Sequence, residues 1–120
     1  MSSTENPKRT RIKICGIKNV EDALLVAQCG ADSIGLVMHP SSPRYIDLAL
    51  ACEIRQAIPA FVTVTALFMD EGSEFVAQVI NRLKPDCLQF HGSETAAFCE
   101  SWQLPYIKAI PMGGRIDAEA

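Results

Sequence analysis

The sequence predicts an α/β protein in which parallel strands are connected by helices. Short apolar segments rich in β-branched residues alternate along the chain with longer segments whose apolar residues recur at helical spacing. Two of the strand-like segments also end in polar or reactive side chains that are followed directly by glycine. Because alternating strands and helices pair their strands in parallel through right-handed crossovers, the fold is either an open doubly wound sheet or a barrel.

Strands and helices are predicted from local pattern, and turn residues separate them. The predicted strands are residues 11–15, 33–38, 61–69, 87–90 and 106–110. The predicted helices are residues 20–29, 47–57, 71–83 and 93–102. Asn19 is the expected N-cap of the first helix and Ser93 that of the last, since a side-chain oxygen at this position accepts a hydrogen bond from the first helical turn.

The two faces of the predicted strands differ, and this difference favours the barrel. A doubly wound sheet has helices on both faces, so its strands are apolar throughout, whereas a barrel strand meets helices on one face only. Polar side chains alternate with apolar neighbours at Lys13, Thr63, Thr65 and Lys108. We therefore expect these side chains to share the inner face of a barrel wall.

Composition indicates a single domain and argues against several classes of partner. With 120 residues, 48% of them hydrophobic and 21% charged, the chain has room for one core. The net charge of −3 gives no electrostatic reason to expect nucleic acid or an anionic membrane as a partner. Residues 1–10 are polar and predict a disordered N-terminal tail without a signal peptide, so a cytoplasmic location is expected.

The cysteines indicate neither disulfides nor a metal site. The chain has 5 cysteines, an odd count, and no CxxC pair. Cys87 and His91 would share a strand face, but two ligands without a further pair make a poor zinc site. No bound metal is therefore expected.

The clearest functional signal lies at the ends of two predicted strands. Lys13 and Cys15 share one face of the first strand, because successive side chains of a strand alternate between faces. Gln89 and His91 share one face of the fourth strand for the same reason. Enzymes built on parallel strands place their active sites at the carboxyl ends of those strands, so these residues predict a site there.

Three segments carry a resemblance to a known family. They are KICGIKNVEDA at residues 13–23, GADSIGLVMHPSSPRYI at residues 30–46 and LQFHGSE at residues 88–94. In order and spacing, residues 11–111 resemble the first half of phosphoribosylanthranilate isomerase, a tryptophan-biosynthesis enzyme built on a (β/α)₈ TIM barrel. The resemblance implies a partial TIM barrel, with about five parallel strands and four helices of its N-terminal half.

The resemblance implies a cofactor-free isomerisation of an aldose to a ketose in L-tryptophan biosynthesis. N-(5-phosphoribosyl)anthranilate opens its ribose ring, forms a Schiff base, loses a proton from C2 and tautomerises to 1-(2-carboxyphenylamino)-1-deoxyribulose 5-phosphate, an Amadori rearrangement. The general base of the family is a cysteine whose motif position here is Cys15. Lys13 on the same face would favour the thiolate by Coulomb attraction. The alternative for Cys15 is an inert buried thiol.

Arg44, Gln89 and His91 are the other candidate substrate-binding residues, together with Lys13. Arg44 lies in a loop whose prolines restrict the backbone, and the resemblance implies that it binds the anthranilate carboxylate. The alternative is a solvated surface arginine. We expect Gln89 and His91 to contact the substrate without transferring the decisive proton, and a structural histidine that hydrogen-bonds a loop carbonyl is the alternative for His91.

The resemblance also implies parts that this sequence does not supply. A complete barrel takes about 200 residues or more, so residues 11–120 are interpreted as one truncated barrel domain. The general acid of the family, an aspartate on a later strand, has no counterpart, because Asp117 follows the last predicted strand. The phosphate site, which barrels commonly build from the loops after strands seven and eight, has none either. Impaired activity is therefore expected.

Two functional hypotheses follow from these observations. In the first, the chain belongs to an isomerase with a phosphorylated sugar–anthranilate substrate and contributes Cys15 and Arg44. In the second, it is a non-catalytic half-barrel fragment or assembly module that lacks the general acid and the phosphate site. Under either hypothesis, open strand edges and an uncovered inner face predict self-association.

Overall fold

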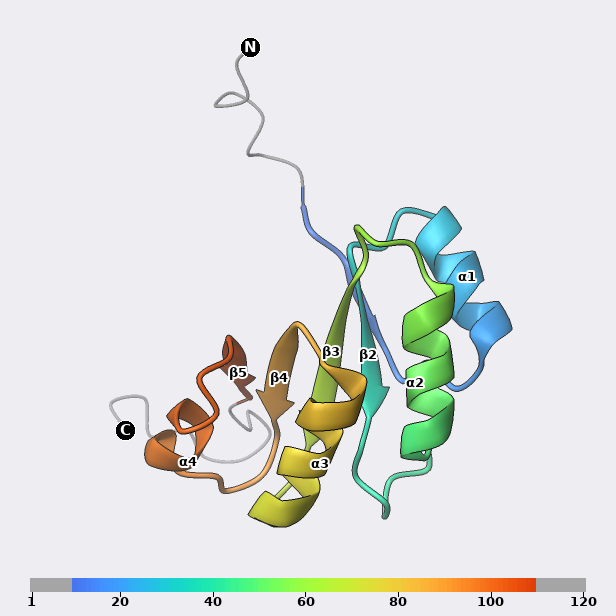
Figure 1. Ribbon diagram of the computed structural model, residues 1–120. Helices are drawn as coiled ribbons and strands as arrows, with labels where there is room; N and C mark the ends of the chain where they lie inside the picture. The colour runs from blue at the N-terminus through green and yellow to red at the C-terminus, as the bar shows by residue number, and fades with distance from the viewer. Residues whose placement is uncertain (1–9, 110–120) are drawn as a thin grey trace.

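The computed structural model describes residues 10–109, which form alternating strands and helices (Figure 1). The strands are β1 (Lys13–Cys15), β2 (Ser33–Val37), β3 (Thr63–Phe68), β4 (Cys87–Phe90) and β5 (Tyr106–Lys108). The helices are α1 (Val20–Gln28), α2 (Leu48–Ala57), α3 (Ser73–Leu83) and α4 (Ala96–Glu100). The predicted N-terminal tail, apart from Thr10, and the residues from Ile110 onward lie outside the described residues.

The strand order identifies the sheet as part of a barrel wall. All neighbouring strands are parallel, and the order β1-β2-β3-β4-β5 follows the chain without a reversal. A doubly wound sheet reverses its strand order at a switch point and so places helices on both faces. Here α1, α2 and α3 lie side by side along one face (Figure 1). The expectation of a barrel wall with one uncovered face is therefore confirmed for the described residues.

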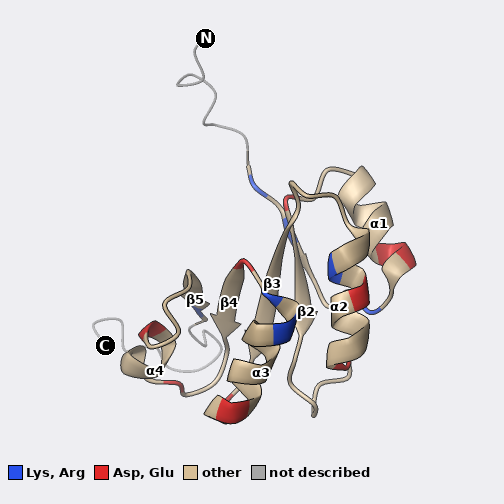
Figure 2. Ribbon diagram, in the orientation of Figure 1, with Lys and Arg blue, Asp and Glu red and all other residues tan. Residues whose placement is uncertain are grey.

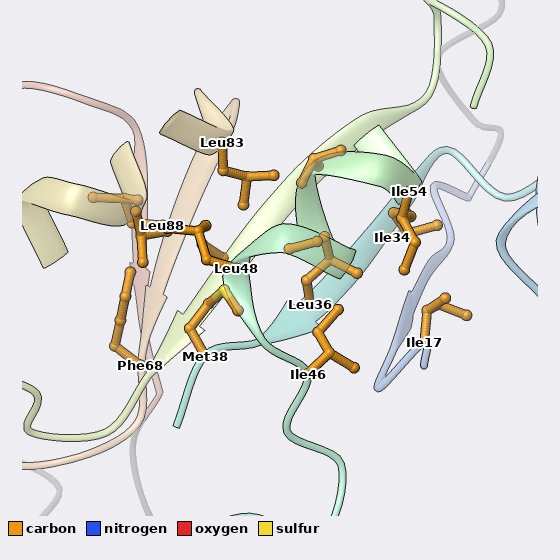
Figure 3. Close-up of a cluster of buried hydrophobic side chains, with 14 of the residues drawn as sticks. Ile17, Ile34, Leu36, Met38, Ile46, Leu48, Ile54, Phe68, Leu83 and Leu88 are labelled. Carbon is orange, nitrogen blue, oxygen red and sulfur yellow. The ribbon is translucent and has the colours of Figure 1, made fainter. Parts of the chain in front are cut away.

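The hydrophobic core lies between the helices and one face of the sheet (Figure 3). Alternate residues of β2 and the segment after it, Ile34, Leu36 and Met38, are fully buried there. Leu48 and Ile54 of α2 meet them from the helix side. Burying one such side chain contributes about 1.5–3 kcal/mol, so the alternation of apolar residues along the strands determines which face the helices cover.

The opposite face of the sheet carries small and polar side chains in two rows. Lys13, Ser33 and Thr63 are in register across β1, β2 and β3. The next row contains Cys15, Gly35, Thr65 and Cys87. Side chains in register on parallel strands point to the same face, so Lys13, Thr63 and Thr65 lie on the inner face as expected.

Lys108 does not lie on the inner face, and that prediction is wrong. Lys108 is in register with Phe90, whose ring packs against Phe98 of α4. Both side chains therefore point to the helix side of the sheet, and Ile107 takes the inner face. A lysine is accommodated at this edge position because its amine donates to the carbonyl of Gly92 and lies 3.3 Å from the Glu94 carboxylate.

The N-cap of α1 is the residue predicted from the sequence, whereas the N-cap of α4 is a different residue. Asn19 accepts a hydrogen bond from the backbone N–H of Asp22 at 2.7 Å, as expected. The last helix is capped by Thr95, which accepts from the N–H of Phe98 at 3.1 Å. Ser93 was the expected cap, but its own N–H donates to Asp70 at 2.7 Å, so residues before Thr95 are held by the neighbouring loop instead.

Charged residues of both signs lie on α2 and α3 (Figure 2). One ion pair links α2 to the segment before β4, with Arg55 Nη1 at 2.7 Å from Asp86 Oδ2. The same carboxylate accepts the backbone N–H of Val64 at 2.9 Å. The hydrogen bond from Arg55 is the main cause that lowers the pKa of Asp86. None of the helices between residues 10 and 109 has the length and apolar character needed to cross a membrane.

Candidate active site

The Cys15 thiol lies on the inner face of the sheet, above Gly35 of the neighbouring strand. A β-carbon added at Gly35 would lie 2.9 Å from Cys15 Sγ and 3.0 Å from Leu67 Cδ1. Real β-carbons do not approach other atoms this closely, so glycine at position 35 leaves the space that the sulfur occupies. The Cys15 side chain is half-buried at the carboxyl end of β1.

The Arg44 side chain lies across the backbone of Gly16, directly after Cys15. A β-carbon at Gly16 would be 2.6 Å from Arg44 Cδ and 2.8 Å from Nη1. Gly16 has a φ of +81°, a left-handed conformation that suits glycine. Arg44 itself is exposed. The guanidinium group is therefore held beside the strand end that carries Cys15, with its face open to solvent.

The loop after β2 positions Arg44 through short local hydrogen bonds. The Ser42 hydroxyl accepts the backbone N–H of Arg44 at 3.1 Å, and the Ser42 carbonyl accepts the N–H of Tyr45 at 3.1 Å. Tyr45 then forms an isolated parallel bridge with Val37. These contacts fold the loop back onto the sheet, as the prolines on either side of the two serines favour.

Lys13, Gln89 and His91 form a line of hydrogen bonds across the inner face. The Lys13 amine donates to Gln89 Oε1, and Gln89 Nε2 lies 2.7 Å from His91 Nε2. The backbone N–H of His91 donates to the carbonyl of Phe68 at 2.8 Å, which continues the parallel ladder beyond β4. Three of the four strand-end residues selected from the sequence are thus in contact, and Cys15 lies on the same face as Lys13.

A pocket of about 90 Å³ opens at the carboxyl ends of β2 and β3. Its polar side chains are His39, Ser42, Arg44 and His91. Its apolar side chains are Val37, Leu67 and Met69, whereas the ring of Phe68, which also borders the pocket, packs against Phe75 on the helix side of the sheet. The pocket residue Leu67 and the Cys15 thiol both lie over Gly35, and Gln89 contacts the pocket residue His91. An apolar floor beneath an arginine and two imidazoles suits an aromatic anion.

His39 is a pocket residue that the sequence analysis did not select. Its Nδ1 lies 2.5 Å from Glu71 Oε2, and the other oxygen of Glu71 accepts the N–H of Met69 at 2.6 Å. The Glu71 side chain is 11% exposed, so this pairing is partly shielded from water. Its position was the available signal in the sequence, because His39 directly follows the predicted strand 33–38, as His91 directly follows the predicted strand 87–90.

Glu94 ties together the loops that follow β3 and β4. Its carboxylate is 3% exposed and accepts the N–H groups of Asp70 at 2.6 Å and Gly92 at 2.9 Å. Burial alone would raise the pKa of Glu94, but these hydrogen bonds and that of Lys108 lower it below its ordinary value. The loop that carries His91 is therefore held by the contacts of Glu94 with Asp70, Gly92 and Lys108.

Cys87 is a second thiol on the inner face, in register with Thr65. Burial raises the pKa of Cys87, and the nearby charge of Lys13 opposes this rise without overcoming it. Between residues 10 and 109, no three histidine, cysteine or acidic side chains lie close enough to hold a metal ion.

Comparison with known proteins identifies the family. Residues 12–120 match the family model described as N-(5'-phosphoribosyl)anthranilate (PRA) isomerase. The chain belongs to this family.

Members of the PRA isomerase family resemble the chain in both sequence and structure. The enzyme of that name from Hahella chejuensis is 45% identical over 117 residues, which cover 98% of this chain and 55% of the relative. The phosphoribosyl anthranilate isomerase of Thermus thermophilus superposes with a TM-score of 0.83 at 35% identity, over 92% of this chain and 56% of that one. This agreement confirms the predicted partial TIM barrel.

A further PRA isomerase structure was solved with a ligand. It contains reduced 1-(o-carboxyphenylamino)-1-deoxyribulose 5-phosphate, and it superposes with a TM-score of 0.79 at 36% identity over 83% of this chain and 53% of that one. The chain spans about half the length of the curated relatives it matches, 55% in the relative from Hahella chejuensis.

Proposed function

We propose that this chain supplies the general base and the anion clamp of a PRA isomerase. The proposed reaction converts N-(5-phosphoribosyl)anthranilate to 1-(2-carboxyphenylamino)-1-deoxyribulose 5-phosphate, in L-tryptophan biosynthesis and in the cytoplasm. The carrying observation is that Arg44, which lines the pocket, lies over Gly16, the residue that directly follows Cys15. Membership of the family and the ligand found in a related structure support this reading.

In the proposed mechanism, the Cys15 thiolate removes the proton from C2 of the ring-opened Schiff base. The electron pair of the broken C–H bond forms a C1–C2 double bond, and the imine nitrogen is neutralised as an enamine results. The 2-hydroxyl then loses its proton as C1 gains one, which gives the ketose. A thiol suits this role because its ordinary pKa of about 8.5 lies close to neutral pH.

Arg44 and the pocket would hold the anthranilate part of the substrate. The guanidinium can donate two parallel hydrogen bonds to a carboxylate, and the apolar floor formed by Val37, Leu67 and Met69 can pack against the aromatic ring. Gln89 and His91 would contact the sugar part, and Lys13 would support them from across the sheet.

No described residue is assigned as the general acid or as a phosphate ligand. We therefore propose that the 120-residue chain on its own turns over slowly. The strands at the edges of the described sheet, β1 and β5, would favour self-association of the isolated chain.

Binding of the product analogue to the 120-residue chain tests the clamp. The probe is reduced 1-(o-carboxyphenylamino)-1-deoxyribulose 5-phosphate, measured by titration calorimetry. Arg44→Lys should weaken binding about tenfold or more, because lysine lacks the planar pair of donors. Arg82→Lys, in the last turn of α3, is the matched control and should bind like the original chain. Equal affinity of the Arg44→Lys and Arg82→Lys chains would rule out the clamp.

Slow product formation, followed by liquid chromatography that separates the two isomers, tests the base. Cys15→Ala should reduce the rate about 100-fold or more, the range expected when a general base is removed. Cys52→Ala in α2 is the control and should leave the rate unchanged. If the Cys15→Ala chain forms product as fast as this control, Cys15 is not the base.

A further inference from the structure

The hydrogen bonds of Lys13, Gln89 and His91 have a fixed direction. The Lys13 amine reaches Gln89 from a strand on the other side of β2 and β3. The row of the inner face that lies between their positions contains the small side chains of Cys15, Thr65 and Cys87, with no side chain at Gly35. All three side chains of the line are therefore in contact across the sheet, from β1 to the end of β4.

Whether each group donates or accepts a hydrogen bond determines what the next group in the line must do. An ammonium group has donors and no acceptor, so the Gln89 atom that faces Lys13 has to be the carbonyl oxygen. This leaves the amide NH₂, which only donates, facing His91. His91 Nε2 then has to accept, and an accepting ring nitrogen carries no hydrogen. The hydrogen of the neutral ring is left on Nδ1.

We propose that Lys13 is a positioning residue that sets the tautomer of His91 through Gln89. His91 then carries its hydrogen on Nδ1 and lines the pocket beside Arg44 as a hydrogen-bond donor. No residue between 10 and 109 accepts a hydrogen bond from this Nδ1, so it is available to a ligand. Resting on the proposed function, this assigns Nδ1–H to an acceptor oxygen of the substrate, a hydroxyl or a carboxylate.

Gln89 can link Lys13 to His91 because its side-chain amide has an acceptor, the oxygen, and a donor, the NH₂ group. A carboxylate in the same place would have two acceptors and no donor. With glutamate at position 89, the ammonium group of Lys13 would still be satisfied, but His91 Nε2 would then face an acceptor. The ring would have to donate from Nε2, which is the reverse of the proposed tautomer.

Nitrogen NMR of the 120-residue chain with ¹⁵N-labelled histidine tests this directly, without substrate or turnover. The chain has 2 histidines, and the His91→Gln variant identifies which signals belong to His91. Spectra are recorded about two pH units above the ordinary histidine pKa of about 6.5, where the ring is neutral. The original chain and Lys13→Arg, which keeps a donor-only group, should both show hydrogen on Nδ1. Gln89→Glu should move the hydrogen to Nε2. Lys13→Met should give a mixture of the two tautomers, because the side-chain amide of Gln89 can then rotate by half a turn and exchange its oxygen and nitrogen.

The inference is overturned if the original chain carries the hydrogen on Nε2, or if Gln89→Glu leaves the tautomer unchanged. Circular dichroism of each variant shows that the fold is retained, and Gln89→Glu is close in shape to the original side chain. Failure of the proposed function would instead appear as unchanged product formation in Cys15→Ala. The two failures are therefore distinguishable.

Discussion

Arg44 lies so close to Gly16 that the glycine has no room for a side chain. A β-carbon there would be 2.6 Å from Arg44 Cδ. Gly16 also follows Cys15 directly, so one glycine both ends β1 and gives the arginine its place beside the thiol. The base and the clamp of the proposed mechanism thus depend on a single position that has no side chain of its own.

Replacing Gly16 should lower both the stability of the chain and its affinity for the product analogue, and a control glycine separates the two effects. Gly16→Ala should destabilise the chain by about 1–2 kcal/mol because φ is +81°, and it should also displace Arg44 and weaken binding of the product analogue. Gly30→Ala is the matched control, since φ is +104° but no atom lies within 4 Å of the new β-carbon. Urea denaturation and calorimetry measure the two effects. Equal binding by both variants would show that Arg44 does not need its position over Gly16.

Gly35 should tolerate no added methyl group, because the Cys15 sulfur and Leu67 occupy the space. Gly35→Ala should lower the free energy of unfolding by about 1–3 kcal/mol, the cost of overpacking a tight site. Gly72→Ala, whose β-carbon would meet nothing within 4 Å, should change it by less. Urea denaturation of both variants checks the difference. Similar stability of the two would contradict the tight contact above Gly35.

The thiols should react with iodoacetamide in an order that follows their surroundings. Burial raises the pKa of Cys87 and of Cys99, which leaves less of each as the reactive thiolate. Cys99 is also 1% exposed, whereas Cys15 is only half-buried. Peptide mapping by mass spectrometry should therefore find Cys15 modified before Cys87 and Cys99. Modification of Cys99 first would contradict the described packing of α4.

Glu94 should make the free energy of unfolding of the chain decrease at low pH. Its pKa in the folded chain is lower than the value of 4.5 for an unperturbed glutamate. The unfolded chain therefore binds this proton more readily, and the stabilising contribution is fully present above about pH 4.5. It is lost as the pH falls through the lower, folded value. The free energy of unfolding, measured by urea between pH 7 and pH 3, should decrease over that window.

Substituting Glu94 tests whether this carboxylate causes the acid sensitivity. Glu94→Gln should cost about 1.5–3 kcal/mol near neutral pH, because it removes a charged acceptor from several donors, and it should flatten the decrease at low pH. Glu74→Gln, on the exposed first turn of α3, should leave the pH profile as it was. An unchanged acid profile in Glu94→Gln would assign the sensitivity to other carboxylates.

The isolated chain should self-associate through β5. Ile107 on this edge strand is 45% exposed and lies on the inner face with Gln89. Edge strands with exposed apolar side chains pair readily with other chains. Light scattering after size-exclusion chromatography should show a mass that rises with concentration, and Ile107→Lys should reduce it. Leu25→Lys, at an exposed position on α1, should not. A monomer at all concentrations would contradict the prediction.

Local pattern predicted the elements of this fold because their causes are local. The apolar alternation of residues 33–38 and the helical spacing of residues 71–83 depend only on the geometry of a strand and of a helix. Asn19 caps its helix as predicted, since its partner is three residues away. Ser93 was expected to cap by the same logic, but a carboxylate from another loop, that of Asp70, accepts its N–H.

Sequence alone determined that the chain alternates strands with helices, that one strand face is apolar, and that Cys15, Gln89 and His91 lie at the carboxyl ends of strands. Only the tertiary structure decided which of these groups meet. Lys13 and Gln89 are 76 positions apart, and His39 and Glu71 are 32 apart. Such pairs depend on strand order, register and loop path, which short segments of sequence do not specify. The physical reason is that a side chain's face is set by its own strand, whereas its partner is set by how the strands assemble.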